Sequence, residues 1–244
     1  MDAAVVKRSA RRYYPAMDKL AVIEATAPIG AQLIADLRLR IVTGALPPGT
    51  RLSEKEIATA YGMSRQPVRE AFIKLAAERL VEIRPQRGTY VCKINLHEVA
   101  QSQFVREAVE ADIARLAARA ADPGWIETLQ AQLRTQSQRV TQGGAVFVEL
   151  DELFHQTLAA AADRSGVWAH IQPLKMHMDR VRYLTAEEFP LDHLVLQHQA
   201  IVDAVAAGDE DAAEASVRVH LRGVLDDLRK VAEMLPHCFD PLPD

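Results

Sequence analysis

The chain has 244 residues, of which 49% are hydrophobic and 25% are charged, a composition typical of a globular protein with a sizeable core. The sequence contains no apolar stretch of about 18 residues, which argues against a membrane-spanning helix, and its first residues do not resemble a secretory signal. Two widely spaced cysteines, Cys92 and Cys238, form no metal or redox motif, so we expect a reduced, cytoplasmic protein.

The net charge of −4 is unevenly distributed along the chain. Residues 1–24 carry +2 and residues 25–95 carry +5, whereas the remainder carries −11. A basic N-terminal third joined to an acidic remainder predicts that only the first part contacts a polyanion. We therefore expect an arm over residues 1–24, a DNA-binding domain over 25–95, a helical domain over 96–235 and a tail over 236–244.

The first third of the chain has mainly helical signals. The arm has basic residues but no periodic pattern, so it fits either a segment that contacts DNA or an unstructured tail. From about Pro28 to Thr43, apolar residues at every fourth position predict a helix, and residues 46–49 then favour a loop. Ser53 and Glu56 form a capping box, which predicts a short helix over residues 54–61.

A further helix is predicted to begin after a tight turn at Gly62, with Ser64 as its N-cap. Arg65 and Arg69 lie one turn apart on one face of its first turns, beside Gln66. In a helix-turn-helix the N-terminal side chains of this helix reach base edges in the major groove, and the arginine fork pairs with O6 and N7 of guanine. The segment is thus predicted to be a recognition helix. The alternative is that these arginines only solvate a helix face.

Two strands, over residues 80–84 and 89–93, are predicted to form a small β-wing after this helix. Arg87 and Gly88 at its tip suit a minor groove, because a residue without a side chain permits close approach. Lys55 begins the preceding short helix and is placed for a phosphate or a base. We expect contacts with double-stranded DNA from Lys55, Ser64, Arg65, Gln66, Arg69, Arg87 and Gly88.

The rest of the chain has helical patterns, so the expected fold is mostly α: a winged helix-turn-helix followed by an antiparallel helical bundle. Proline and glycine punctuation separates the helices of this bundle from one another. We expect them over residues 97–121, 124–141, 146–162, 166–185, 191–207 and 210–234.

Three of these helices carry ionisable residues on apolar stripes that step by three and four. Asp151 and His155 share a stripe in the third helix, His198 lies on that of the fifth, and His220 on that of the sixth. One aspartate and three histidines suit a divalent metal, zinc first, with nickel, manganese or iron as alternatives. Four ligands close a tetrahedral zinc site, whereas an octahedral ion keeps two positions for an effector. His193 replaces His198 if the fifth helix is phased differently.

Several ordered motifs in both parts of the chain resemble one family. They are Pro48-Gly49, Gly62-Met63-Ser64-Arg65, Pro67-Val68-Arg69-Glu70-Ala71, Arg87-Gly88-Thr89-Tyr90-Val91, Arg106-Glu107-Ala108-Val109-Glu110, Asp151-Glu152-Leu153-Phe154-His155, His198-Gln199-Ala200-Ile201 and His220-Leu221. With these motifs the first part resembles the GntR family of bacterial transcription regulators. The helical part resembles the FCD effector-binding domain of its FadR subfamily.

The resemblance implies a homodimer whose DNA-binding domains read a palindromic operator and whose helical domains bind a small organic acid. It implies that the aspartate and the three histidines hold a divalent metal, and that Arg106 binds the carboxylate of the effector. The alternative for Arg106 is a surface salt bridge with Glu110. Three places depart from the family pattern: Arg79 replaces a usual glycine, Gln197 replaces a frequent glutamate, and Asp163-Arg164-Ser165 lacks the asparagine common after the third helix.

We therefore expect a metabolite-controlled transcription regulator, acting as a repressor, and not an enzyme. A DNA-binding regulator with a purely structural metal and no effector is one alternative. A metal-dependent enzyme with an attached DNA-binding domain is another, but no general base stands out beside the histidine stripes.

Overall fold

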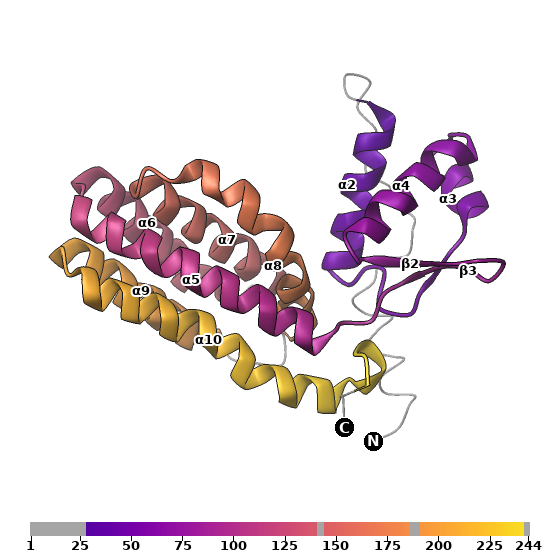
Figure 1. The fold of residues 1–244 in the computed structure, drawn as a ribbon. Coiled ribbons are helices and arrows are strands. Elements are labelled where there is room, and N and C mark those ends of the chain that lie inside the picture. The colour runs from indigo at the N-terminus through magenta and orange to yellow at the C-terminus, as the bar shows by residue number, and fades with distance from the viewer. Residues whose placement is uncertain (1–27, 141–143, 186–190, 242–244) are drawn as a thin grey trace. The chain divides into compact units, whose positions relative to one another are not determined.

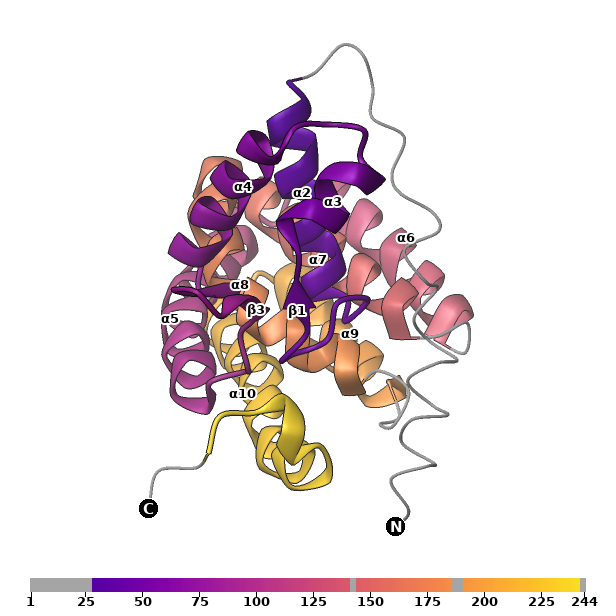
Figure 2. The ribbon, with the colours of Figure 1, turned by 90° about the vertical axis from the view of Figure 1, so that its right-hand side faces the viewer.

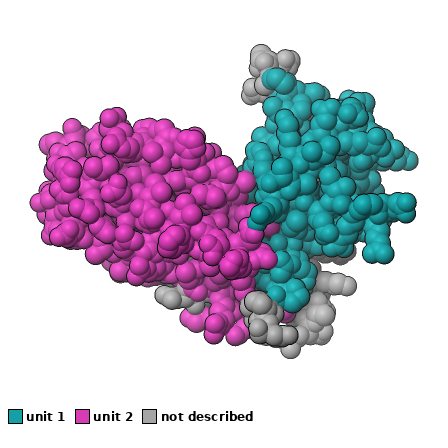
Figure 3. All heavy atoms as spheres, viewed as in Figure 1, with its two compact units in different colours: residues 1–94, 237–241 teal, residues 95–236, 242–244 magenta. Residues whose placement is uncertain are grey.

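The computed structural model describes residues 28–140, 144–185 and 191–241, so the expected arm lies outside it. The chain falls into two compact units (Figure 3). The first, here called the head, runs to Ile94 and also includes His237–Pro241; the second, here called the bundle, covers Asn95–Pro236. None of the described helices has the length and apolarity needed to cross a lipid bilayer.

The head combines helices with a small antiparallel sheet of order β1-β3-β2. Figure 2 shows β1 beside β3, where Arg51 pairs with Tyr90. The strand β1 was not predicted, because two residues are too short to show an alternating pattern. The elements of the head (Figure 1) are α2 (Ile29–Val42), β1 (Arg51–Leu52), α3 (Glu54–Ala60), α4 (Arg65–Ala77), β2 (Val81–Arg84) and β3 (Gly88–Val91). The 3-10 helix η2 (Pro236–Cys238) begins at the last residue of the bundle and ends in the head.

Part of the expected tail belongs to the head. Ile94 pairs with Phe239 in a parallel bridge, and the backbone N–H of Ile94 donates to the carbonyl of Cys238 at 2.9 Å. Phe239 and Cys238 are buried there. The residues after position 234 are too few to show a periodic pattern, so their pairing with Ile94 could not be predicted from the sequence.

The helix-turn-helix begins its two helices differently. The Ser53 hydroxyl accepts the backbone N–H of Glu56 at 3.3 Å, as the capping box predicted. Ser64 stands at the N-cap of α4, but its hydroxyl makes no cap hydrogen bond, so that part of the prediction was wrong. Because Pro67 occupies the third helical position and has no N–H, one of the two backbone donors that such a cap can use is missing.

The end of α4 has a backbone conformation that favours glycine before Leu80. Arg79 occupies this position with φ 57°, in the left-handed region. A residue with a side chain pays about 1 kcal/mol for this conformation, whereas glycine does not. The turn is nevertheless made, and the N–H of Leu80 donates to the carbonyl of Leu75 at 2.9 Å.

The bundle is built around α5, which packs against four of its other helices. Asp122 caps α6, because its side chain accepts the N–H groups of Gly124 and Trp125 at 2.8 and 3.1 Å, and Pro123 is the first residue of the helix. The helices agree with the predicted ones to within about two residues. They are α5 (Leu96–Ala120), α6 (Pro123–Arg139), α7 (Gly144–Ala161), α8 (Ser165–Thr185), α9 (Asp192–Ala207) and α10 (Glu210–Met234).

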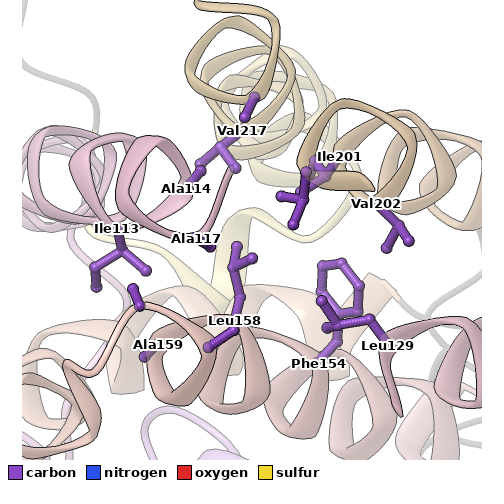
Figure 4. Close-up of a cluster of buried hydrophobic side chains, with 14 of the residues drawn as sticks. Ile113, Ala114, Ala117, Leu129, Phe154, Leu158, Ala159, Ile201, Val202 and Val217 are labelled. Carbon is purple, nitrogen blue, oxygen red and sulfur yellow. The ribbon is translucent and has the colours of Figure 1, made fainter. Parts of the chain in front are cut away.

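A dense apolar core holds the bundle together (Figure 4). Phe154 and Leu158 of α7 converge there with Ile201 of α9 and Val217 of α10. Each such side chain contributes about 1.5–3 kcal/mol when it is fully buried. This apolar core adjoins a polar cluster, since the ring of Phe154 stacks on that of His198.

A salt-bridge cluster at the surface joins α5 to α10. Glu107 accepts from Arg222 at 2.5 Å and from Arg218 at 2.9 Å, and Gln103 donates to its other oxygen at 2.6 Å. The hydrogen bond from Arg222, followed by that from Arg218, lowers the pKa of Glu107 to about 2. Because this pKa is lower in the folded state, the carboxylate stabilises the fold above about pH 4.5.

Replacing Glu107 with glutamine is therefore expected to lower the free energy of unfolding by about 1 kcal/mol at pH 7. The expected change is this small because Arg218 and Arg222 are partly exposed and water screens their ion pairs. The loss should shrink below about pH 4.5 and disappear near pH 2. Urea unfolding of wild type and Glu107→Gln from pH 7 to 3 measures it, with the exposed Glu127→Gln on α6 as control. A difference between wild type and variant that is independent of pH would contradict the assignment.

Candidate functional site

Four ionisable side chains meet inside the bundle. Asp151 and His155 come from one face of α7, His198 from α9 and His220 from α10. All four are at most 1% exposed, and one ligand atom from each lies within 4.8 Å of all the others. The structure thus brings together the four residues that the apolar stripes singled out, whereas His193 is exposed at the start of α9.

The cluster has the dimensions of a metal site. Nε2 of His220 lies 3.1 Å from Nε2 of His155 and 3.3 Å from Nε2 of His198. Oδ1 of Asp151 lies 3.4–3.8 Å from the three nitrogens. Tetrahedral bonds of about 2.1 Å place ligand atoms about 3.4 Å apart, so these separations are close to those that a divalent ion imposes on its ligands.

The other nitrogen of each imidazole faces an acceptor. Nδ1 of His198 lies 2.8 Å from Oε1 of Gln136, whose amide nitrogen donates to the carbonyl of Leu150, and Nδ1 of His220 lies 3.1 Å from Oε1 of Gln197. An acceptor at Nδ1 keeps the proton there and leaves the lone pair of Nε2 free for a metal.

His155 is oriented by a carboxylate instead. Its Nδ1 lies 2.7 Å from Oε2 of Glu110, a short contact that departs from ideal hydrogen-bond geometry. Burial would raise the pKa of Glu110, but Arg106 and His155 outweigh it and lower this pKa to about 2. Glu110 is therefore ionised and strengthens His155 as a donor.

The protonation states also suit a cation. Burial lowers the pKa of His198 and holds that of His220 well below its usual value, so both rings are neutral at pH 7. Burial would raise the pKa of Asp151, but Arg182 and His155 keep it well below its usual value. Burial would also lower the pKa of His155, but Glu110 and Asp151 outweigh it and raise this pKa. The cluster therefore presents an ionised carboxylate and the two neutral imidazoles of His198 and His220 to a common centre.

Asp151 uses its two oxygens differently. Oδ2 accepts from Arg182 of α8, whereas Oδ1, buried among the imidazoles, has no hydrogen-bond partner. An unsatisfied buried carboxylate oxygen is costly unless a cation or donor meets it. This oxygen supports the fit of the four residues to a divalent metal.

Arg106 lies next to this cluster and not at the surface. Its side chain is fully buried, and its Nε donates to Oε1 of Glu110 at 2.5 Å. The salt bridge weighed as an alternative is thus present, but in the interior. Burial would lower the pKa of Arg106, and Glu110 and Asp151 outweigh that effect. The second terminal nitrogen, Nη2, is buried without a hydrogen-bond partner.

The head exposes the residues expected to contact DNA. Lys55 of α3 and Ser64, Arg65, Gln66 and Arg69 around the start of α4 are all exposed. Gln66 donates to Glu70 one turn further along. Both arginines contact the same carboxylate, that of Glu54.

The wing tip has the backbone conformation that a glycine permits. Gly88 has φ 110°, and a Cβ added there would lie 3.1 Å from Nε of Arg51. A side chain at this position is therefore strained and crowded. Arg51, which is exposed like Arg87, brings its guanidinium close to Gly88 at the tip.

Several residues of these sites were missed in the sequence. Gln136 lies on the same buried stripe of α6 as Leu129 and Leu133, a signal that could have identified it. Gln197 precedes His198, and its only signal in the sequence was its departure from the expected family pattern. Glu54, Arg51 and Arg182 act through tertiary contacts and had no local signal.

Comparison with known proteins identifies the two parts of the chain. Residues 29–91 match the gntR family of bacterial regulatory proteins, and residues 102–223 match the FCD domain. The chain is 40% identical over 210 residues to the HTH-type transcriptional repressor RspR of Escherichia coli, covering 85% of this chain and 92% of RspR. It is 30% identical over 199 residues to a probable D-xylose utilization operon transcriptional repressor of Paenarthrobacter nicotinovorans, covering 81% and 87%.

Solved structures agree on the fold. E. coli McbR/YncC superposes with a TM-score of 0.70 at 21% identity, covering 84% of this chain and 99% of that chain. The mostly α fold and the regulator class predicted from the sequence are both confirmed, and the relatives are regulators rather than enzymes. The chain belongs to the GntR family of bacterial transcription regulators and is a DNA-binding transcription regulator with an FCD domain.

Proposed function

We propose that the protein is a repressor whose affinity for its operator is set by a small carboxylate bound beside a divalent metal in the bundle. The observation that carries this proposal is the buried cluster of Asp151 and three histidines next to the unsatisfied Nη2 of Arg106. Groups buried in this way are costly without partners, which indicates that both a cation and an anion belong there.

The metal would be held by Asp151, His155, His198 and His220. Zinc is the first choice, because three imidazoles and one carboxylate suit a tetrahedral ion, and nickel, manganese and iron are the alternatives. When bound, the ion supplies positive charge for a carboxylate in the interior of the bundle. The acceptors at Nδ1 supply the orientation of the rings.

Arg106 is proposed to bind the effector. Its guanidinium is fixed by Glu110, and Glu110 also contacts the ligand His155, so effector and metal would share one rigid support. Arginine suits a carboxylate because its planar fork offers paired N–H donors. A small organic acid is therefore the proposed effector class.

The head is proposed to be the part whose DNA binding responds to the effector in the bundle. A homodimer would place two heads on the half-sites of a palindromic operator in the cytoplasm, with contacts from the exposed residues of α3, α4 and the wing. Effector binding would change the spacing or mobility of the heads and so lower the affinity. Repression is supported by the names of two relatives, RspR and the D-xylose operon repressor.

A thermal-shift screen tests the effector. The metal-loaded protein is heated with small mono- and dicarboxylates, hydroxy acids and, as neutral comparison, D-xylose. At a hundred times its Kd a ligand stabilises by about 2.7 kcal/mol, which predicts a Tm increase of roughly 5–10 °C for one carboxylate. Arg106→Lys keeps the charge against Glu110 but loses the fork, so it should keep the metal and lose this increase.

A purely structural metal is the second candidate, and the closed set of four ligands favours it. In that case the metal raises the Tm but no carboxylate raises it further, and Arg106→Lys behaves as wild type. The same screen therefore separates the two functions. Stabilisation by D-xylose alone would contradict the carboxylate proposal.

A further inference from the structure

One carboxylate in the head contacts both arginines of the recognition helix. Glu54 is the first residue of α3, and Arg65 and Arg69 lie one turn apart on α4. Arg65 donates to Oε2 of Glu54 from Nη2 at 2.8 Å and from Nε at 3.2 Å. Arg69 donates from Nε to both oxygens at 3.0 Å.

Fold stability does not account for this cluster. The arginine side chains are 59% and 55% exposed and that of Glu54 is 26% exposed. Ion pairs in such positions contribute little to folding, because water and salt screen them and the long side chains lose freedom. The arrangement instead restricts two mobile side chains on the surface that is proposed to meet DNA.

The contacts leave the arginines able to read a base. Glu54 accepts from Nε of Arg69 and from Nε and Nη2 of Arg65. Each guanidinium therefore keeps further N–H groups at its terminal nitrogens. A guanine is recognised by two N–H groups that reach O6 and N7 together. Both arginines can therefore stay on Glu54 while their outer ends meet bases.

Glu54 also reduces the charge of this surface. Two adjacent guanidinium groups attract any phosphate backbone, whatever its sequence. A carboxylate between them lowers this non-specific attraction and leaves the directional contacts with bases. Orientation and charge thus act together in favour of selectivity.

We propose that Glu54 is a positioning residue that holds Arg65 and Arg69 in the orientation that reads guanine and thereby sets the ratio of specific to non-specific DNA binding. The proposal rests on the proposed role of the two arginines in base reading. It assigns to Glu54 no direct contact with DNA.

The test uses the full-length protein and DNA duplexes. Wild-type protein first selects binding duplexes from a random-sequence library, and the guanines of a selected duplex are then replaced by 7-deazaguanine, which lacks N7 but still forms base pairs. Affinities for the selected, the 7-deaza and a random duplex are measured at about 150 mM salt. Glu54→Gln is compared with Glu56→Gln, an equal loss of charge on the same helix turn, at a side chain without contact to either arginine.

For wild type and Glu56→Gln, we expect 7-deazaguanine at a read position to weaken binding about tenfold. In Glu54→Gln, 7-deazaguanine should weaken binding less than about threefold. The ratio of its affinity for the selected duplex to that for the random duplex should fall about tenfold relative to wild type, and its Tm should equal that of wild type. A variant that only disturbed the fold would weaken all duplexes equally and would lower the Tm.

If wild type and Glu54→Gln lose the same affinity on 7-deaza substitution and have the same ratio of selected to random binding, the proposal for Glu54 is overturned. The role of the arginines in recognising guanine is then unaffected. Insensitivity of the wild type to every 7-deaza replacement overturns the reading of guanine itself, and with it the role of Glu54. A loss in Glu56→Gln as large as in Glu54→Gln shows that charge alone acts, which also overturns the positioning role.

Discussion

Replacing Arg65 with alanine is expected to lower the affinity for a selected duplex about a hundredfold and to leave the affinity for random DNA within about fivefold. The guanidinium is the only part of this exposed side chain that can pair with O6 and N7 of guanine, and its loss also removes one phosphate-attracting charge. Competition between selected and random duplexes at about 150 mM salt measures both affinities.

The matched control for this variant is Arg134→Ala, which removes an exposed arginine from α6 of the bundle. It has the same effect on net charge but should leave the binding ratio at the wild-type value. The Tm of both variants should equal that of wild type, since neither side chain is buried. A binding ratio unchanged by Arg65→Ala would contradict the assignment of α4 as the reading helix.

The helices of this protein could be predicted closely because their ends are marked chemically. Asp122 and Pro123 begin α6, and Gly208 ends α9 in the left-handed conformation. The core followed from the same patterns, since a stripe that steps by three and four faces inward whatever it packs against. The strand β1 was missed because pairing with β3, and not its own sequence, defines it.

The metal-type cluster could be predicted because its members lie on apolar stripes, where an ionisable residue is conspicuous. The residues that orient it were harder to find. Gln197 lies between an exposed residue, Leu196, and a buried one, His198, so it has no clear place on an apolar stripe. Its role depends on the packing of α10 beside α9, which brings Nδ1 of His220 to its side chain. Glu110 shares a stripe with Arg106, so its salt bridge was considered, but not its contact with His155.

Contacts between side chains of neighbouring helices could not be predicted from the sequence. Glu54 reaches two arginines that are 11 and 15 residues away, which depends on the angle between α3 and α4. Ser64 shows the opposite case, in which a local rule fails, and Pro67 contributes to this because it removes one of the two backbone donors that such a cap can use.

Replacing His198 with alanine is expected to reduce the bound metal from about one ion per chain to near zero after dialysis. Three ligands remain, but loss of one ligand from a closed four-ligand site weakens binding by several kcal/mol. Wild type should gain roughly 4 kcal/mol of stability at a metal concentration a thousand times its Kd, and the variant almost none. Elemental analysis and thermal unfolding with and without a chelator measure the two effects.

The chelator is needed because His198 also contributes to packing. Its ring stacks on Phe154 with centroids 4.2 Å apart and lies near Phe147, so alanine leaves a cavity that costs about 2–4 kcal/mol even without metal. The difference between chelated wild type and chelated variant measures this packing, and only the additional difference with metal measures ligation. His193→Ala, an exposed histidine of the same helix, should match wild type in both. A metal-dependent increase in Tm that survives in His198→Ala would show that the cluster binds its ion without this ring, or that the ion lies elsewhere.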